Sequence, residues 1–269
     1  MKSINYYGET GGKISGKPKG SVMIVSFQLE GEDFIALNGG PHFTFSPGIS
    51  FFVSCETGHE LDDLWNKLSS EGGTVLMELD KYPFSEKFGR LEDKYGISWQ
   101  LNFASREQKI TPFLMYTGNQ HGKAEEAMNF YISLFKDSNI INIEHYSVEE
   151  NQSEGIVKHA LFSLNGQEFM ANDSNMEHPF TFTPAISLVV NCETQEEIDD
   201  LWEKFSRDGK TDQCGWLSDK YGVSWQIVPI VLGQMMQDKD AEKSEQVMKA
   251  ILQMKKINIR DLKQAYELK

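Results

Sequence analysis

The sequence predicts an α+β fold made of two tandem copies of one domain, and three observations support this. The segment Asp93–Gln100 returns as Asp219–Gln226 with seven of eight residues identical. Residues 43–68 and 180–205 are identical at 16 of 26 positions. In both copies, runs of strand-like composition alternate with amphipathic helical patterns. The repeat is much longer than that of a solenoid, so each copy is expected to be a domain.

Composition excludes several classes of protein. The chain has 269 residues, which is enough to bury a core without disulfides. Its formal net charge of −14 argues against general nucleic-acid binding, which needs a basic face. No apolar run approaches the ~18 residues of a membrane span, and the first residues lack the apolar core of a secretory signal. We therefore expect neither nucleic acid nor a membrane as a partner.

Cysteine usage points to a reducing compartment. The chain has three cysteines, and two of them, Cys55 and Cys192, are equivalent positions of the two copies. Equivalent residues of two tandem domains are not expected to pair. The third, Cys214, lies before Gly215 with no recognisable base beside it and is expected to be inert. A cytoplasmic location is the resulting expectation.

The first copy is expected to span residues 1–105. Gly11–Gly20 should be a loop, because Gly, Lys and Pro dominate it. Thr57 begins a helix, and Glu60 three residues later completes a capping box. A loop through Tyr82–Ser85 should lead to the repeated turn. Strands are expected at residues 3–7, 22–29, 33–37, 49–55, 75–79 and 97–101.

The second copy is expected to span residues 106–231 and keeps this order, with Thr194 and Glu197 as its capping box. It has an additional start, a strand at 110–116 and a helix at 124–135, without an equivalent in the first copy. The apolar stripe of this helix comprises Ala124, Ala127, Met128, Tyr131, Leu134 and Phe135.

Residues 232–269 are expected to form a helical tail. Asn258 and Asp261 have the spacing that caps the start of a last short helix. The apolar stripe before it comprises Val247, Ile251 and Met254.

The missing strand and helix of the first copy would leave a sheet edge and an apolar face uncovered. Three explanations stay open. The natural chain starts upstream of Met1, or a second chain donates the missing elements, or the helical tail covers the gap. A close match of the rest of the first copy favours the upstream start.

Four segments of the second copy carry a family resemblance. They are AEEAMNFY at 124–131, PAIS at 184–187, DDLW at 199–202 and DKYGVSWQ at 219–226. Together they resemble the PhnB-like branch of the vicinal-oxygen-chelate superfamily, which includes glyoxalase I, bleomycin-resistance proteins and extradiol dioxygenases. The resemblance implies tandem glyoxalase-like domains of paired βαβββ modules that curl around a cavity. It also implies pairing, either as a homodimer or as a pseudo-dimer within one chain.

Family enzymes hold a divalent metal with His and Glu side chains, one of them a Glu on the last strand. The matching positions here are Gln100 and Gln226, and a neutral amide is a poor ligand for Zn²⁺ or Ni²⁺. The strands at 110–116 and 185–190 supply no His, Asp or Glu. We therefore expect no metal and no other cofactor. Proteins of this branch are often labelled demethylubiquinone methyltransferase-like, yet no Gly-rich loop for S-adenosylmethionine is present.

Two kinds of argument identify the candidate ligand-binding residues, namely the chemistry of their side chains and the family resemblance. An amide such as Gln100 or Gln226 can both donate to and accept from a ligand, or it can simply satisfy neighbouring groups. His159 lies in mid-strand, where it is either cavity-facing or structural. The resemblance adds three residues that are expected to face the cavity, and one residue at the end of the strand that carries a Glu ligand in family enzymes. These are Phe113, Met115, Ser187 and Asn172.

Three functions stay open at this point. The first is a metal-free protein that binds a small molecule in an apolar cavity, with Gln226 as polar anchor. The second is an enzyme, either a metal-dependent lyase, isomerase or dioxygenase, or the methyltransferase that the family label suggests. The third is a dimerising structural module whose cavity is filled by its own Phe and Met side chains.

Overall fold

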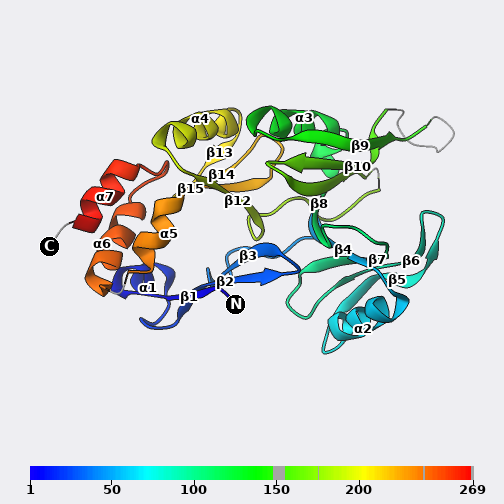
Figure 1. Cartoon of the computed structure of the whole chain (residues 1–269), viewed down its shortest axis with the longest axis horizontal. Coiled ribbons are helices and arrows are strands. Elements are labelled where there is room, and N and C mark those ends of the chain that lie inside the picture. The colour runs from blue at the N-terminus through cyan, green and yellow to red at the C-terminus, as the bar shows by residue number, and fades with distance from the viewer. Residues whose placement is uncertain (148–154, 175, 239, 268–269) are drawn as a thin grey trace. The chain divides into compact units, whose positions relative to one another are not determined.

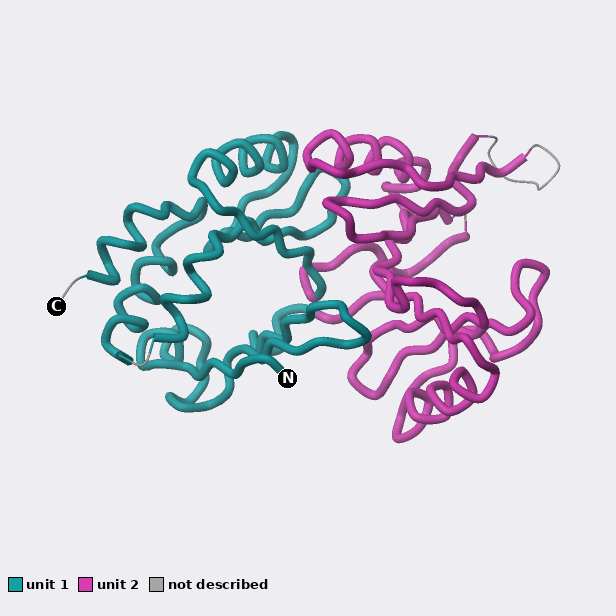
Figure 2. Tube along the Cα trace, in the orientation of Figure 1, with its two compact units in different colours: residues 1–43, 186–269 teal, residues 44–185 magenta. Residues whose placement is uncertain are grey.

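The computed structural model describes residues 1–147, 155–174, 176–238 and 240–267. Helices and strands are mixed along the chain, so the predicted α+β class is confirmed (Figure 1). The chain forms two compact units (Figure 2). Unit 1 comprises residues 1–43 and 186–269, and unit 2 comprises residues 44–185. None of the described helices is long and apolar enough to cross a membrane.

Unit 2 contains one sheet of eight strands in the order β5-β6-β7-β4-β8-β11-β10-β9. The first-copy strands are β4 (Ile49–Cys55), β5 (Thr74–Tyr82), β6 (Ser85–Glu92) and β7 (Ser98–Phe103). The second-copy strands are β8 (Ile110–Tyr116), β9 (Asn139–His145), β10 (Val157–Leu164) and β11 (Gln167–Asp173). With α2 (Gly58–Ser69) and α3 (Ala124–Leu134) they make two βαβββ modules, joined by antiparallel pairing of β4 with β8. The pairing of modules implied by the resemblance is therefore present.

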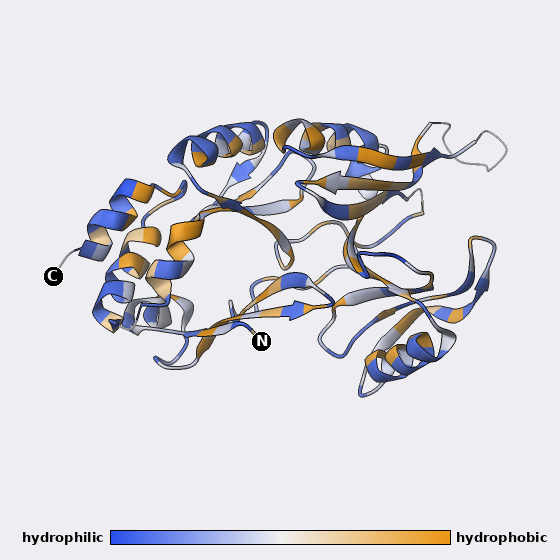
Figure 3. Cartoon of the chain, viewed as in Figure 1, coloured by the Kyte–Doolittle hydropathy of each residue, from blue (hydrophilic) through white to orange (hydrophobic). Residues whose placement is uncertain are grey.

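The two helices of unit 2 cover one face of this sheet. Gly89 of β6 lies against the ring of Trp65 from α2, where a Cβ atom would come within 2.4 Å of the ring. On the other module, the Asp173 carboxylate accepts from the backbone N–H of Ala124, the first residue of α3. Figure 3 shows hydrophilic and hydrophobic residues along both helices, as expected of elements with one buried side. The opposite face of the sheet is therefore the one turned away from the helices.

The repeated segment builds the same turn twice. The Asp93 carboxylate accepts from the backbone N–H groups of Tyr95 and Ile97 and from the Trp99 indole N–H at 3.0 Å. Gly96 adopts a φ of 87°, which favours glycine. The equivalent Asp219 binds the Trp225 indole at 2.8 Å. The turn fixes each tryptophan on one side of its strand, and strand alternation then puts the next residue, a glutamine, on the other.

Unit 1 is built from two smaller sheets and several helices. One sheet has the order β1-β2-β3, with β1 (Ser3–Tyr6), β2 (Val22–Leu29) and β3 (Glu32–Leu37). The other has the order β12-β15-β14-β13, with β12 (Ser187–Cys192), β13 (Lys210–Thr211), β14 (Trp216–Ser218) and β15 (Ser224–Pro229). The helices are α1 (Glu9–Ser15), α4 (Gln195–Ser206), α5 (Ile230–Met236), α6 (Ala241–Ile251) and α7 (Ile259–Glu267), so the tail is helical as predicted. In the described part of the chain, the first copy has no counterpart of β8 and α3, as expected.

Two sequence predictions were wrong. The expected loop at Gly11–Gly20 contains part of α1, which is held by α6, since the Thr10 N–H donates to the Glu245 carboxylate at 2.6 Å. Gly11 also lies against Met248 of α6, which explains how a glycine-rich segment with poor helix propensity is helical here. The second concerns the stretch between Tyr82–Ser85 and the repeated turn, where no strand was predicted. A tight hairpin leads there into β6, whose charged residues obscured the alternation of a strand.

Candidate functional site

The residues of interest in unit 2 lie on the sheet face turned away from α2 and α3, here called the candidate face. Residues paired across neighbouring strands share a face. Arg90 pairs with Gln100, Gln100 with Phe52, and Phe52 with Thr111, so side chains of four strands form one row. A second row begins at Ser50, two residues from Phe52 on the same strand.

An apolar cluster occupies the centre of the candidate face. It consists of four buried side chains and two partly buried ones that pack against them. The members are Phe113, Met115, Leu161 and Met170, with Phe52 and Phe180. The predicted site residues Phe113 and Met115 are therefore brought together, and the ring centroid of His159 lies 6.3 Å from that of Phe113.

The repeated glutamine lies beside this cluster and forms a buried hydrogen bond. Gln100 Nε2 donates to Ser50 Oγ at 2.9 Å, with the two residues 6% and 0% exposed. Gln226 Nε2 donates to Ser187 Oγ, also at 2.9 Å, in unit 1. The predicted residues are thus divided between the two units. Gln100 lies on the same face as Phe113 and Met115, while Gln226 and Ser187 form the equivalent pair in unit 1.

Two unpaired polar atoms mark the same face. Among the described residues, Asn172 Oδ1 and Thr111 Oγ1 are buried without a hydrogen-bond partner. Asn172 pairs with Met115 in the sheet register. The neighbouring Asp173 points to the other face, where its carboxylate accepts from three backbone N–H groups and fixes the start of α3. Burial raises the pKa of Asp173, and those hydrogen bonds oppose the rise. Of the two, Asn172 is the residue that a ligand on the candidate face could reach.

Arg90 is a functional candidate that the sequence did not reveal. It is 9% exposed, and its Nη2 donates to the Pro47 carbonyl at 2.8 Å. Its Nε lies 3.5 Å from Ser98 Oγ, and its Nη1 lies 3.9 Å from Met115 Sδ. Burial lowers the pKa of the guanidinium to about 10, and Glu92 opposes this. In the sequence, Arg90 is marked only by its place two residues after Phe88, and β6, the strand that carries it, was not predicted.

An irregular segment after β11 lies against the candidate face. It contributes Phe180 to the apolar cluster, and Ser46 Oγ donates to the Thr181 carbonyl. Thr183 Oγ1 donates in return to the Thr44 carbonyl at 2.8 Å. Ser46 and Thr183 are equivalent positions of the two copies, so these bonds are reciprocal, as across a two-fold axis. The same segment carries His178, whose pKa is lowered by burial and by the charge of Arg90.

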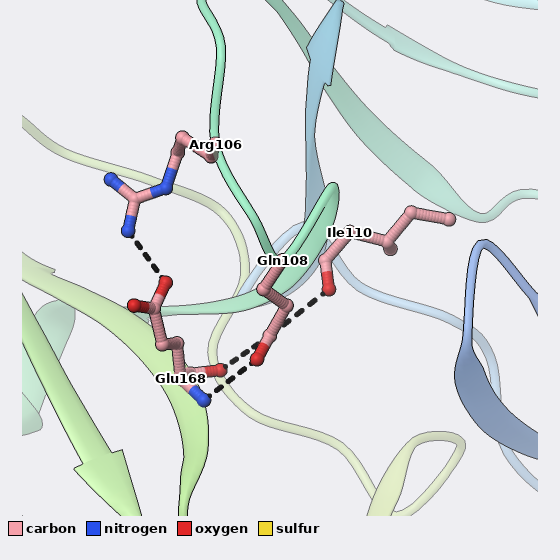
Figure 4. A network of polar contacts seen from close by, with 4 residues as sticks. All are labelled: Arg106, Gln108, Ile110 and Glu168. Atoms are coloured by element: carbon pink, nitrogen blue, oxygen red, sulfur yellow. Dashed lines mark hydrogen bonds and ion pairs between the residues drawn. The ribbon is translucent and has the colours of Figure 1, made fainter.

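The segment that connects the two copies is fixed to β11 (Figure 4). The amide of Gln108 accepts from the Glu168 N–H at 2.8 Å and donates to its carbonyl at 2.9 Å. Arg106 Nη2 forms an ion pair with the Glu168 carboxylate at 2.6 Å. Burial and the charge of Arg106 lower the pKa of His159. In this part of the face, the positive charge of Arg106 is therefore paired with the negative charge of Glu168.

The residues of the candidate face do not suit the divalent metal of the family enzymes. Its polar side chains near the apolar cluster are Ser50, Gln100, Asn172, Arg90 and His159. One imidazole with neutral oxygens, beside a guanidinium, is a weak donor set for Zn²⁺ or Ni²⁺. Among the described residues, no group of three His, Cys, Asp or Glu side chains could hold a metal ion.

Comparisons with known proteins agree with the repeat. A sequence model of the family described as 3-demethylubiquinone-9 3-methyltransferase matches residues 1–102 and 108–228. A PhnB protein from Bacillus cereus, also described as a 3-demethylubiquinone-9 3-methyltransferase, is 53% identical; the match covers 45% of this chain and 99% of that one, with a TM-score of 0.43. A Staphylococcus aureus protein is 34% identical, covering 44% of this chain and 92% of that one, with a TM-score of 0.20. Glyoxalase I from Zea mays is 11% identical over 72% of each chain, with a TM-score of 0.47. No curated protein matches the chain.

Proposed function

Because the chain belongs to the family described as 3-demethylubiquinone-9 3-methyltransferase, which includes PhnB proteins, we propose that it binds a small organic molecule without a catalytic metal. The binding site is the candidate face of unit 2. Apolar parts of the ligand contact Phe113, Met115 and their neighbours, and Gln100 is the polar anchor. The observation that carries the proposal is the buried Gln100–Ser50 hydrogen bond at the position where family enzymes have a metal-binding Glu.

Three features of the face support this function. An amide can hold a carbonyl or hydroxyl group of a ligand by donating or accepting. The unpaired oxygen of Asn172 offers a second polar contact. Phe180 comes from an irregular segment rather than from the sheet, so it is the cluster side chain that a ligand could displace without breaking strand pairing. Small-molecule sites commonly combine an apolar lining with a few such polar groups.

Benzamide is a suitable first probe, because it presents an apolar ring and a neutral amide. We expect it to shift the methyl NMR signals of Met115 and Met170, with Met235 of unit 1 as an unaffected reference. For a ligand of this size the Kd should be about millimolar. Gln100→Ala should weaken binding about fivefold or more by removing the anchor. Gln226→Ala is the matched control, since it removes the same Gln–Ser bond in unit 1.

Absence of shifts at both methionines, or equal binding by Gln100→Ala and the wild type, would overturn the proposal. Native mass spectrometry tests the metal-free part. Protein purified without chelator or added metal should have the subunit mass of 30.6 kDa. A stoichiometric metal adduct lost on chelation would contradict it and support a metal-dependent enzyme instead.

A structural module is the second candidate. The observation that favours it is the cluster of Phe, Met and Leu side chains that already fills the centre of the face. If the fold serves only to bring chains together, the protein should be a stable dimer that binds no probe, and native mass spectrometry reports that dimer directly. The family description offers a third candidate, methyl transfer to a demethylubiquinone. Specific binding of S-adenosylmethionine in a calorimetric titration would support it.

A further inference from the structure

The Arg90 guanidinium is a buried charge that Glu92, two residues along β6, influences electrostatically without a recorded ion pair. Within the described residues it takes part in no ion pair, and its three recorded acceptors are the Pro47 carbonyl, the Ser98 hydroxyl and the Met115 sulfur. All three are neutral. Burying an unpaired ion is costly, because neutral acceptors replace only part of its hydration. Arg106, in the segment between β7 and β8, shows the usual solution, an ion pair with Glu168.

The fold itself does not require a guanidinium at this position. Arg90 pairs with Gln100 between β6 and β7, and Trp216 pairs with Gln226 between β14 and β15. Trp216 is therefore the equivalent residue of the second copy. The second copy therefore builds the same hairpin with an uncharged side chain at this position. The fold alone does not explain why the first copy has a charged one.

The contacts of Arg90 leave two of its donor nitrogens with weak acceptors. Nη2 is firmly held by the Pro47 carbonyl at 2.8 Å, which fixes the plane of the group. Nη1 faces a thioether sulfur at 3.9 Å, and sulfur is a weak acceptor. Nε lies 3.5 Å from a hydroxyl, at the limit of a hydrogen bond. Two donors could therefore exchange weak acceptors for the two oxygens of an anion.

We propose that Arg90 binds the oxyanion group of the ligand, a carboxylate or a phosphoryl group, while Gln100 and the apolar cluster hold its uncharged part. This inference rests on the proposed function, because it specifies the ligand class of the same face. An anion would supply the missing counter-charge, which is why the site should prefer anionic over neutral ligands of equal shape.

Three probes of similar shape test the charge: benzamide, benzoate and phenyl phosphate. We expect the better of the two anions to bind the wild-type chain about tenfold more tightly than benzamide. The preferred anion tells whether the group is carboxylate or phosphoryl. In Arg90→Gln, which removes the charge but keeps an N–H donor at the place of the arginine Nε near Ser98, the preference should fall to about one. Arg260→Gln is the control, since it removes the same charge from an exposed side chain.

The possible outcomes distinguish this inference from the proposed function. Equal binding of benzamide and both anions by the wild type leaves the proposed function standing and overturns this inference. Failure of all three probes to bind overturns both. A preference that survives in Arg90→Gln also overturns the inference. To show that the variant is folded, its thermal unfolding is measured without ligand, where removing an unpaired buried charge should leave the melting temperature equal or higher.

Discussion

At the scale of single residues, the aspartate of the repeated turn has the clearest energetic role. In Asp219→Asn one carboxylate oxygen becomes an NH₂ group, and either the Trp225 indole or the backbone loses its acceptor. We expect a loss of about 1–3 kcal/mol in the free energy of unfolding, because Trp225 is 2% exposed and water cannot replace the bond. Thermal unfolding measures it.

Asp93→Asn is the matched variant in the first copy. Its tryptophan, Trp99, is only half-buried, so water can take over part of the hydrogen bonding and the loss should be smaller. An Asp219→Asn protein that melts at the wild-type temperature would show that this carboxylate does not stabilise the turn.

His159 gives unit 2 a dependence on pH. Burial and the charge of Arg106 lower its pKa below the ordinary value of 6.5, and Glu144 opposes them. As the pH falls below 6.5, the unfolded chain takes up the proton first, so stability present above that pH is lost until the folded pKa is reached. Urea unfolding at about pH 7.5 and 5.5 should therefore show a smaller pH-dependent loss for His159→Gln than for the wild type. Equal losses would contradict this.

The residues of the candidate site differ in how far sequence could predict them. Gln100 and Gln226 were predictable, because they end a repeated segment whose turn determines on which side of the strand the following side chains lie. Arg90 was not, because its equivalent is Trp216 and no comparison between copies marks it. Whether a charged side chain meets an opposite charge depends on contacts with residues distant in sequence, such as that of Arg90 with the Pro47 carbonyl, which no local pattern contains.

At the scale of elements, the packing of α2 on β6 depends on Gly89. A Cβ atom there would lie 2.4 Å from the Trp65 ring and 3.1 Å from the Leu79 Cα. Gly89→Ala should therefore cost about 1–3 kcal/mol by forcing the helix and the strand apart. Gly58→Ala is the control, because Gly58 begins α2 with open space around it. That variant should be as stable as the wild type or up to about 1 kcal/mol more stable. Equal melting temperatures of the two variants would contradict the close approach.

Elements were predictable where their own residues decide the structure. β2, β4 and β8 have the predicted bounds, because long apolar or alternating runs specify them. α4 begins at its predicted cap, where Thr194 and Glu197 form both bonds of the capping box. The helix α1 was not predictable, since its stability comes from Glu245, more than two hundred residues later in the chain.

At the scale of the molecule, the thiols of both units are protected. Burial raises the pKa of Cys55 and of Cys192 to about 11, and burial also raises that of Cys214. Since the thiolate is the reactive form, none of the three should react quickly with a disulfide reagent at about pH 8 in the native protein. All three should react in denaturant. A thiol that labels within seconds in the native protein would contradict this.

The duplication was readable from the sequence, but the grouping of its halves was not. Each compact unit takes one part from each copy, and unit 2 combines β4–β7 of the first with β8–β11 of the second. The segments that join these modules, such as Phe43–Gly48 and Phe180–Ala185, are nearly the same in both copies. Sequence identity of this kind is compatible with pairing inside a copy or between copies, and only the contacts in space decide between them.

This grouping has a consequence for the order of events during synthesis. Residues 1–43 leave the ribosome first, yet their partners in unit 1, including Met236 and Glu245, follow only after all of unit 2. The intervening residues 44–185 number 142, which at ~5–20 residues per second means a delay of roughly 7 to 28 s. Throughout that interval the first strands remain without their final surroundings, and side chains that end up buried, such as Tyr7 and Met23 at 5% and 6% exposure, are open to other nascent chains. The middle of this polypeptide can therefore mature before its beginning does, and its first strands are the segment most in need of a chaperone.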